Sequence, residues 1–139
     1  METFAVYGHA IVSLVLFAGI VMALSPFAAL KKQGAGLAPG ATPGEDYADP
    51  AYRLHRAYLN GAETLPVFAT VTLAAILTGV SPFWVNLLAS LVLVTRLAML
   101  VVHLRGIGKP HNGPRSFLYV AGWACMLVIG IMAIAGVLF

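Results

Sequence analysis

The chain has 139 residues, of which 60% are hydrophobic and only 9% are charged. This composition excludes an ordinary soluble domain and indicates that the lipid bilayer is the solvent for most of the chain. The formal net charge of +3 is explained by basic loops, so no nucleic-acid partner is expected. The single cysteine, Cys125, excludes an internal disulfide and is expected to be a small core residue.

Four apolar stretches are long enough to cross a bilayer, which takes about 20 residues in a helix. They cover about residues 4–30, 52–80, 83–104 and 115–139. The first stretch is too long for a signal peptide and lacks its basic start, so we expect a retained span. The sequence therefore predicts an all-α integral membrane protein, with one four-helix membrane domain over residues 1–139.

Charge predicts the orientation of the spans. Seven of the eight Lys and Arg residues flank the loops after the first and third spans, whereas the loop "GVSPF" after the second span has no charge. By the positive-inside rule, the first and third loops are cytoplasmic and both termini are outside. The first loop is rich in Gly and Pro and is expected to be an irregular connection. His111 in the third loop is expected to be an exposed surface histidine.

Polar residues share one face of the second predicted helix. At 100° per residue, the side chains of Arg53, Arg56, Asn60 and Glu63 fall within about 80° of arc. This face is expected to point away from lipid.

The third span carries a matching pair, because Arg96 and His103 are seven residues apart and share a face. Glu63 lies about 15 Å along its helix from Arg53, and Arg96 lies about 14 Å from Arg105, at 1.5 Å per residue. Glu63 and Arg96 are thus expected at nearly the same depth. A charge at the bilayer centre costs about 2.5 to 3.5 kcal/mol on insertion scales. We therefore expect these two side chains to form an ion pair.

The polar residues are predicted to form a funnel that opens to the cytoplasm. Arg115, Ser116 and Tyr119 begin the fourth span on that same side. A funnel with this many cationic groups favours an anionic or zwitterionic ligand. The sequence has no nucleotide-binding glycine motif, no metal-ligand spacing and no serine-nucleophile motif. No metal is expected.

The stretch "RLHRAYLNGAETLP" contains the pattern Arg-Ala-x-x-Asn-x-x-Glu-x-x-Pro, from Arg56 to Pro66. With four spans and the polar residues of the third and fourth spans in the same order, the chain resembles the MAPEG superfamily, the membrane-associated proteins in eicosanoid and glutathione metabolism. The resemblance is to a bacterial-type member, which implies a bacterial inner membrane.

The resemblance implies a homotrimer that holds glutathione, as a co-substrate, between subunits near the cytoplasmic face. It implies that Arg115 faces the thiol and that Ser116 assists it, as the catalytic residues. The predicted binding residues are Arg53, Arg56, Asn60, Glu63, Arg96, His103 and Tyr119. In the family the position of His103 is commonly tyrosine, and Tyr58 replaces a polar residue of some members.

Two functions are compatible with this pattern. The first is an enzyme that conjugates glutathione to lipophilic electrophiles or uses it to reduce lipid hydroperoxides, with its apolar substrate arriving from the surrounding membrane lipid. The second is a non-catalytic membrane protein that binds or conducts a small anion through the same funnel. The outer halves of the spans are almost wholly apolar, as in "AILTGVSPFWVNLLASLVL", which favours a closed site over a pore.

Overall fold

The computed structural model describes residues 2–108 and 113–139, so His111 lies outside the described residues. A short helix, α1 (Glu2–Ala5), precedes four long helices. These are α2 (Gly8–Gly34), α3 (Pro50–Leu77), α4 (Pro82–Arg105) and α5 (Pro114–Leu138). Each long helix is long and apolar enough to cross a membrane. The prediction of an all-α protein with four membrane helices is confirmed.

The clearest difference from the predicted spans is at the end of α2, which continues four residues beyond position 30. Lys31 and Lys32 are therefore helical. Lys32 is buried, and its Nζ donates a hydrogen bond to the carbonyl oxygen of Pro39 at 3.1 Å. Because the first loop supplies a polar partner for the buried Lys32 ammonium group, α2 can continue beyond the apolar stretch.

Each of the last three long helices begins with a proline, at positions 50, 82 and 114. Proline suits the first helical position because its fixed φ is helical and its missing N–H would have no intrahelical partner there. At the start of α3, the Asp49 carboxylate also accepts a hydrogen bond from the backbone N–H of Ala51 at 2.8 Å. This is the usual role of an N-cap aspartate.

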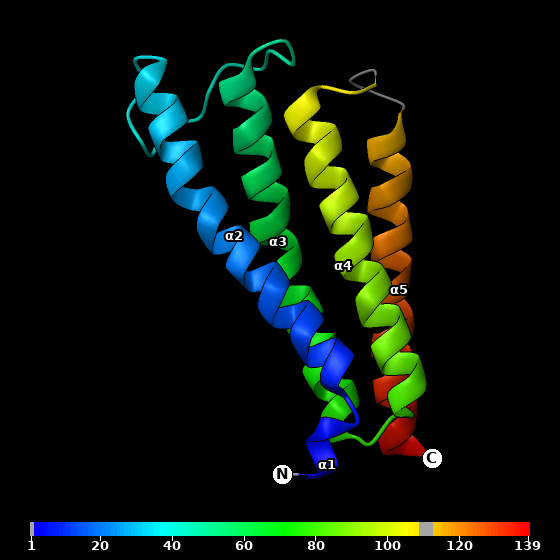
Figure 1. Cartoon of the computed structure of the whole chain (residues 1–139). Helices are drawn as coiled ribbons and strands as arrows, with labels where there is room; N and C mark the ends of the chain where they lie inside the picture. The colour runs from blue at the N-terminus through cyan, green and yellow to red at the C-terminus, as the bar shows by residue number, and fades with distance from the viewer. Residues whose placement is uncertain (1, 109–112) are drawn as a thin grey trace.

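The helices alternate in direction, as Figure 1 shows. The C-terminal ends of α2 and α4 and the N-terminal ends of α3 and α5 lie together, and we call this the basic end. The short α1 and the C-terminus of the chain lie at the opposite end, which we call the apolar end. The side of the membrane that each end faces remains a prediction from charge.

The core of the bundle is apolar. Phe17 of α2 packs edge-on against Phe68 of α3, with ring centroids 6.1 Å apart, and Phe68 has no exposed surface. Val85, Val92 and Ile129 are also buried. Many other large apolar side chains point outward and are exposed, as expected where a helix faces lipid acyl chains instead of water.

At the apolar end, the polar residue Asn86 has a structural role, because it links α4 to the start of the chain. The side-chain amide of Asn86 in α4 accepts a hydrogen bond from the Ala10 backbone N–H at 2.9 Å and donates one to the Val6 carbonyl at 2.7 Å. The Tyr7 hydroxyl donates to the Val80 carbonyl at 2.7 Å. The bonds of Asn86 satisfy backbone groups on either side of the break between α1 and α2, and the bond of Tyr7 joins that break to the connection between α3 and α4.

The end of α4 offers a test of the fold at the basic end. Gly106 has φ +64°, in the left-handed region, and a Cβ there would lie 3.3 Å from Cζ of Arg53. We expect Gly106→Ala to lower the free energy of unfolding by about 1 to 2 kcal/mol, the usual penalty for an L-residue in this conformation. Thermal unfolding in detergent measures the change. Gly34→Ala is the control, because no atom lies within 4 Å of its added Cβ. Equal stability of the two variants would contradict this account.

Candidate functional site

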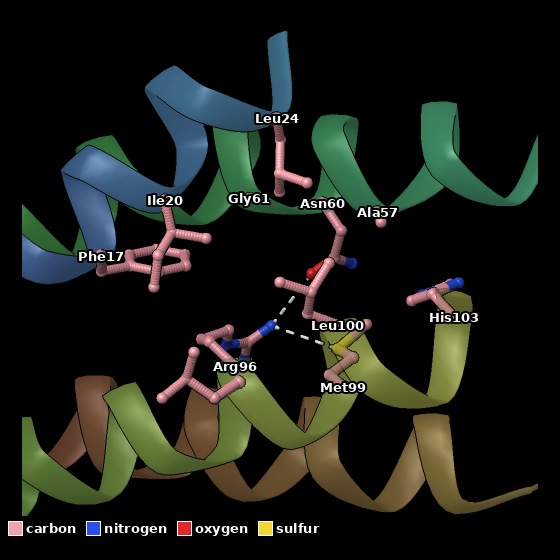
Figure 2. A pocket seen from close by; sticks show the side chains of 11 residues that line it. Phe17, Ile20, Leu24, Ala57, Asn60, Gly61, Arg96, Met99, Leu100 and His103 are labelled. Atoms are coloured by element: carbon pink, nitrogen blue, oxygen red, sulfur yellow. Dashed lines mark hydrogen bonds between the residues drawn. The ribbon is translucent and has the colours of Figure 1, made fainter. Parts of the chain in front are cut away.

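Arg96 lies at the centre of a polar cluster inside the bundle. Its side chain is only 4% exposed. One guanidinium nitrogen, Nη1, donates to Oδ1 of Asn60 at 3.1 Å and lies 3.7 Å from Sδ of Met99, as Figure 2 shows. The other, Nη2, donates to the carbonyl oxygen of Tyr119 at 3.1 Å. A single side chain of α4 thus joins α3 to α5.

The charge of Arg96 receives further support from an aromatic ring. Its Cζ lies 5.2 Å from the centroid of the Tyr119 ring, within the range of a cation–π interaction. Its Nε is buried and has no hydrogen-bond partner among the described residues. The groups that contact Arg96 here are neutral, so the guanidinium charge is solvated by dipoles and not by an acid.

Glycine at position 122 makes room for this arrangement. A Cβ at Gly122 would lie 2.6 Å from Nη2 of Arg96 and 2.7 Å from Oγ1 of Thr95. Neither distance is possible for real atoms in contact. Gly122 is therefore required for the Arg96 conformation. No sequence pattern indicates this, because the contact joins two helices.

The predicted ion pair between Glu63 and Arg96 is not formed within the described chain, where the Arg96 guanidinium bonds to Asn60 and Tyr119 instead. Asn60 and Glu63 are three residues apart, so their side chains diverge by about 60° around α3. The Arg96 side chain also extends toward the C-terminal end of α4, where it meets Met99 and the shallower Asn60. Glu63 itself is exposed.

A small cavity lies beside Arg96, between α2, α3 and α4. Arg96, Asn60 and His103 line its polar side, and Phe17 and Leu24 of α2 are among its apolar walls (Figure 2). Its volume is about 20 Å³, which is enough for about one water molecule. A tripeptide cannot fit there, so this cavity is not by itself a ligand site.

A larger groove runs between α3 and α5 on the outside of the chain. Its first section has a volume of about 190 Å³ and is lined by Glu63, Tyr119 and Trp123, among others. It shares Val67 and Trp123 with a section of about 240 Å³, which in turn shares Val71 with one of about 440 Å³. The last two sections are lined almost wholly by apolar side chains. We call this the α3–α5 groove.

A second polar cluster is built on a residue that sequence analysis missed, Tyr47 of the first loop. Its hydroxyl oxygen lies 2.8 Å from Nδ1 of the buried His103, in a hydrogen bond. Cζ of Arg115 lies 4.0 Å from the centroid of the Tyr47 ring. The sequence does contain one indication of this role, because Tyr47 is the one aromatic residue in a loop rich in Gly and Pro.

Arg53 holds the loop that carries Tyr47. Its Nη1 donates to the carbonyl oxygens of Tyr47 at 2.9 Å and Ala48 at 2.8 Å. Arg53 therefore has a structural role in the first loop, in addition to the ligand-binding role predicted for it. The remaining predicted residues at this end, Arg56 and Ser116, are exposed.

The single funnel that the sequence predicted is divided in the described chain. An inner group contains the buried Arg96 and His103 and the half-buried Asn60. An exposed group contains Arg56, Glu63, Ser116 and Tyr119, with Tyr119 44% exposed. Arg115 is half-buried between the first loop and the start of α5. The two groups meet at Tyr119, because its carbonyl bonds to Arg96 and its ring lines the α3–α5 groove.

Comparison with known families decides which protein class this arrangement belongs to. The model of the MAPEG family matches residues 7–135, which include nearly all of the four long helices. The chain belongs to the MAPEG family. No curated protein and no solved structure matches it. The resemblance of the Arg56 to Pro66 motif to MAPEG proteins is thereby confirmed, and MAPEG membership supports a function of the membrane glutathione-transferase or eicosanoid type.

The partners of Arg96 in this MAPEG chain can be tested with two double-mutant cycles. Residues in contact couple by about 0.5 to 3 kcal/mol, whereas independent sites add within about 0.5 kcal/mol. We expect coupling between Asn60→Ala and Arg96→Leu, and additivity between Glu63→Gln and Arg96→Leu. Unfolding free energies of the purified protein measure both cycles. Stronger coupling of Arg96 to Glu63 than to Asn60 would contradict the hydrogen bonding described above.

Gly122 provides an independent test of the same cluster. We expect Gly122→Ala to destabilise the protein, because the added methyl group displaces the Arg96 guanidinium from the Tyr119 carbonyl. A buried charged donor that loses a partner costs about 1.5 to 3 kcal/mol. The matched control is Gly136→Ala in the same helix, where the nearest atom to the added Cβ is at an ordinary 3.4 Å. A Gly122→Ala variant as stable as this control would show that the close approach is unimportant.

Proposed function

We propose that this MAPEG protein is a membrane enzyme that uses glutathione, either to conjugate lipophilic electrophiles or to reduce lipid hydroperoxides. The observation that carries the proposal is the α3–α5 groove. Its section at Glu63 and Tyr119 is partly polar, and the sections that follow are apolar. Ligand pockets of this kind have volumes of about 300 to 1,000 Å³, and the three sections together reach that range.

The charged groups near the groove match those of glutathione, which has two carboxylates, one ammonium group and a thiol. The exposed Glu63 carboxylate suits the ammonium group, and the exposed Arg56 suits a carboxylate. Pairs between a charged donor and a charged acceptor are the stronger class of hydrogen bond. The hydrogen bonds of Arg96 to Asn60 and to the Tyr119 carbonyl stabilise the side of the groove that faces the bundle interior.

A second copy of the chain is proposed to complete the site. Glu63 lies well inside α3, in a helix that is apolar enough to cross a membrane. A charged residue left facing lipid at that depth costs about 2.5 to 3.5 kcal/mol on insertion scales. Contact with a neighbouring subunit removes that penalty. The number of subunits, three, is taken from MAPEG proteins.

Arg115 is proposed to activate the thiol. A free cysteine thiol has a pKa of about 8.5, so only about 3% is thiolate at neutral pH. A guanidinium keeps its charge throughout the physiological range and favours the thiolate. Ser116, the next residue, is exposed at the start of α5, and its hydroxyl is suited to donate a second hydrogen bond.

The alternative function, anion conduction, is less well supported by the apolar end. Asn86, a polar side chain there, is bonded to backbone groups of α1 and α2. The wide section of the α3–α5 groove is lined mainly by Val71, Ile134 and other apolar residues. An anion that reached Arg96 would therefore meet no polar path toward the apolar end along this groove.

Calorimetric titration of the detergent-solubilised protein with glutathione tests the proposal. We expect a dissociation constant below about 1 mM, which corresponds to about −4.1 kcal/mol. Glu63→Gln should weaken binding by about tenfold or more, because a hydrogen bond to a charged group contributes about 1.5 to 3 kcal/mol. Glu45→Gln, which removes an exposed carboxylate from the first loop, is the matched control. Absence of glutathione binding to the wild-type protein would overturn the proposal.

The role of Arg115 is tested by ultraviolet difference absorbance of bound glutathione, which reports thiolate. Arg115→Leu should retain much of the binding but lose the thiolate signal at neutral pH, because the facing positive charge is gone. Arg105→Leu is the control, since Arg105 is an exposed arginine at the C-terminal end of α4, which belongs to the basic end. A full thiolate signal in the Arg115 variant would exclude Arg115 as the activating group.

A further inference from the structure

Tyr47 connects three parts of the chain that are far apart in sequence. It belongs to the first loop, its hydroxyl bonds to His103 near the end of α4, and its ring lies under Arg115 at the start of α5. The ring of Tyr52 in α3 also meets it edge-on, with centroids 6.2 Å apart. The proposed thiol-activating arginine and the buried histidine therefore share one neighbour.

The loop presents Tyr47 in a defined position. Arg53 donates from Nη1 to the carbonyl oxygens of Tyr47 and of Ala48. The Arg53 side chain in turn packs against Gly106, where a Cβ would lie 3.3 Å from its Nε. The Asp46 carboxylate accepts a hydrogen bond from the Ala48 N–H at 2.8 Å. The segment that leads into α3 is thus a built turn, fixed to the end of α4.

We propose that Tyr47 is a positioning residue, which orients the Arg115 guanidinium with its ring and fixes the proton of His103 with its hydroxyl. The first part rests on the function proposed above for Arg115, whereas the second part does not. Both parts give the first loop a role in the site.

The ring of Tyr47 restricts Arg115 because an arginine guanidinium stacks on the negative face of an aromatic ring. A long arginine side chain otherwise has many rotamers, and a loss of order would spread its positive charge over several positions. With the guanidinium held 4.0 Å from the ring centroid, the charge stays at one place beside the start of α5.

The hydroxyl of Tyr47 determines which nitrogen of His103 carries the proton. A cation over the ring withdraws electron density from the phenol, which makes its O–H a better donor and a poorer acceptor. Tyr47 then donates to Nδ1, and the neutral imidazole carries its proton on Nε2. His103 also lines the small cavity beside Arg96 and Asn60, so this choice of tautomer places an N–H donor on the ring edge away from Tyr47.

The histidine part is tested without glutathione, by heteronuclear NMR of isotope-labelled imidazole nitrogens in the full-length protein. We expect His103 to be neutral, with the proton on Nε2 and a hydrogen-bonded Nδ1. The resonances are assigned by their loss in His103→Gln. Tyr47→Phe should shift the Nδ1 resonance of His103, and Tyr52→Phe, which removes a hydroxyl from the adjacent ring, should not. An Nδ1 resonance that is the same in Tyr47→Phe and wild type would overturn this part.

The arginine part is tested by the thiolate absorbance of bound glutathione in two variants. Tyr47→Phe retains the ring under Arg115 and should keep the wild-type thiolate signal. Tyr47→Leu removes the ring and should lower the ratio of thiolate to thiol by about two- to fivefold, the fold-change that matches an exposed cation–π contact. Equal signals in Tyr47→Leu and wild type would overturn this part.

The two measurements also separate failure of this inference from failure of the proposed function. A wild-type protein that binds no glutathione overturns the proposed function and, with it, the arginine part. The imidazole spectra still decide whether Tyr47 fixes His103. A wild-type protein that binds glutathione as thiolate, with a signal unchanged in Tyr47→Leu, leaves the proposed function standing and removes Tyr47 from it.

Discussion

The interaction on which the rest of this site depends is the solvation of one buried charge, the guanidinium of Arg96. In a bundle made almost wholly of apolar side chains, an arginine at mid-helix is tolerated only if polar groups replace water around it. Asn60, the Tyr119 carbonyl and the Tyr119 ring do so, from α3 and α5. The same contacts fix the distances among these helices. The requirement to solvate Arg96 therefore also shapes the groove in which Tyr119 and Glu63 are exposed.

The first loop has a comparable role nearer the end of the bundle. Its length and its Gly and Pro content suggest a passive connection, but its final residues are bonded to Arg53, Asp46 and His103. Tyr47 brings an aromatic ring to a place where the four long helices supply mainly cations. A cluster of like charges repels itself in a low-dielectric setting. The negative face of the Tyr47 ring lies against Arg115 and offsets part of that positive charge without adding an acid.

Much of the fold could be predicted from the sequence, because membrane helices are specified by length and hydropathy. The prolines at positions 50, 82 and 114 also mark helix starts by local chemistry. The site was harder to predict. Helical periodicity placed Asn60 and Glu63 on one face, but the 60° or so between them is enough to direct one side chain inward and the other into the groove. Whether Arg96 meets Asn60 or Glu63 depends on the direction of its side chain, which no periodicity encodes. The contacts of Tyr47 and Gly122 depend on tertiary approach and have no local signal.

The closeness of Gly122 to Arg96 has a consequence for how such a chain can change over generations. While arginine is present at position 96, any side chain at position 122 collides with it. If arginine is first replaced by a smaller residue, only Oγ1 of Thr95, at 2.7 Å, still lies too close to a Cβ at position 122. Rotation of the Thr95 side chain then admits alanine, which is favoured as the better helix former. Once alanine is there, a return of arginine meets a methyl group in the space that its guanidinium needs. The pair therefore acts as an evolutionary ratchet: the order of substitutions matters, and a lineage that loses the buried charge first does not regain it by a single reversion.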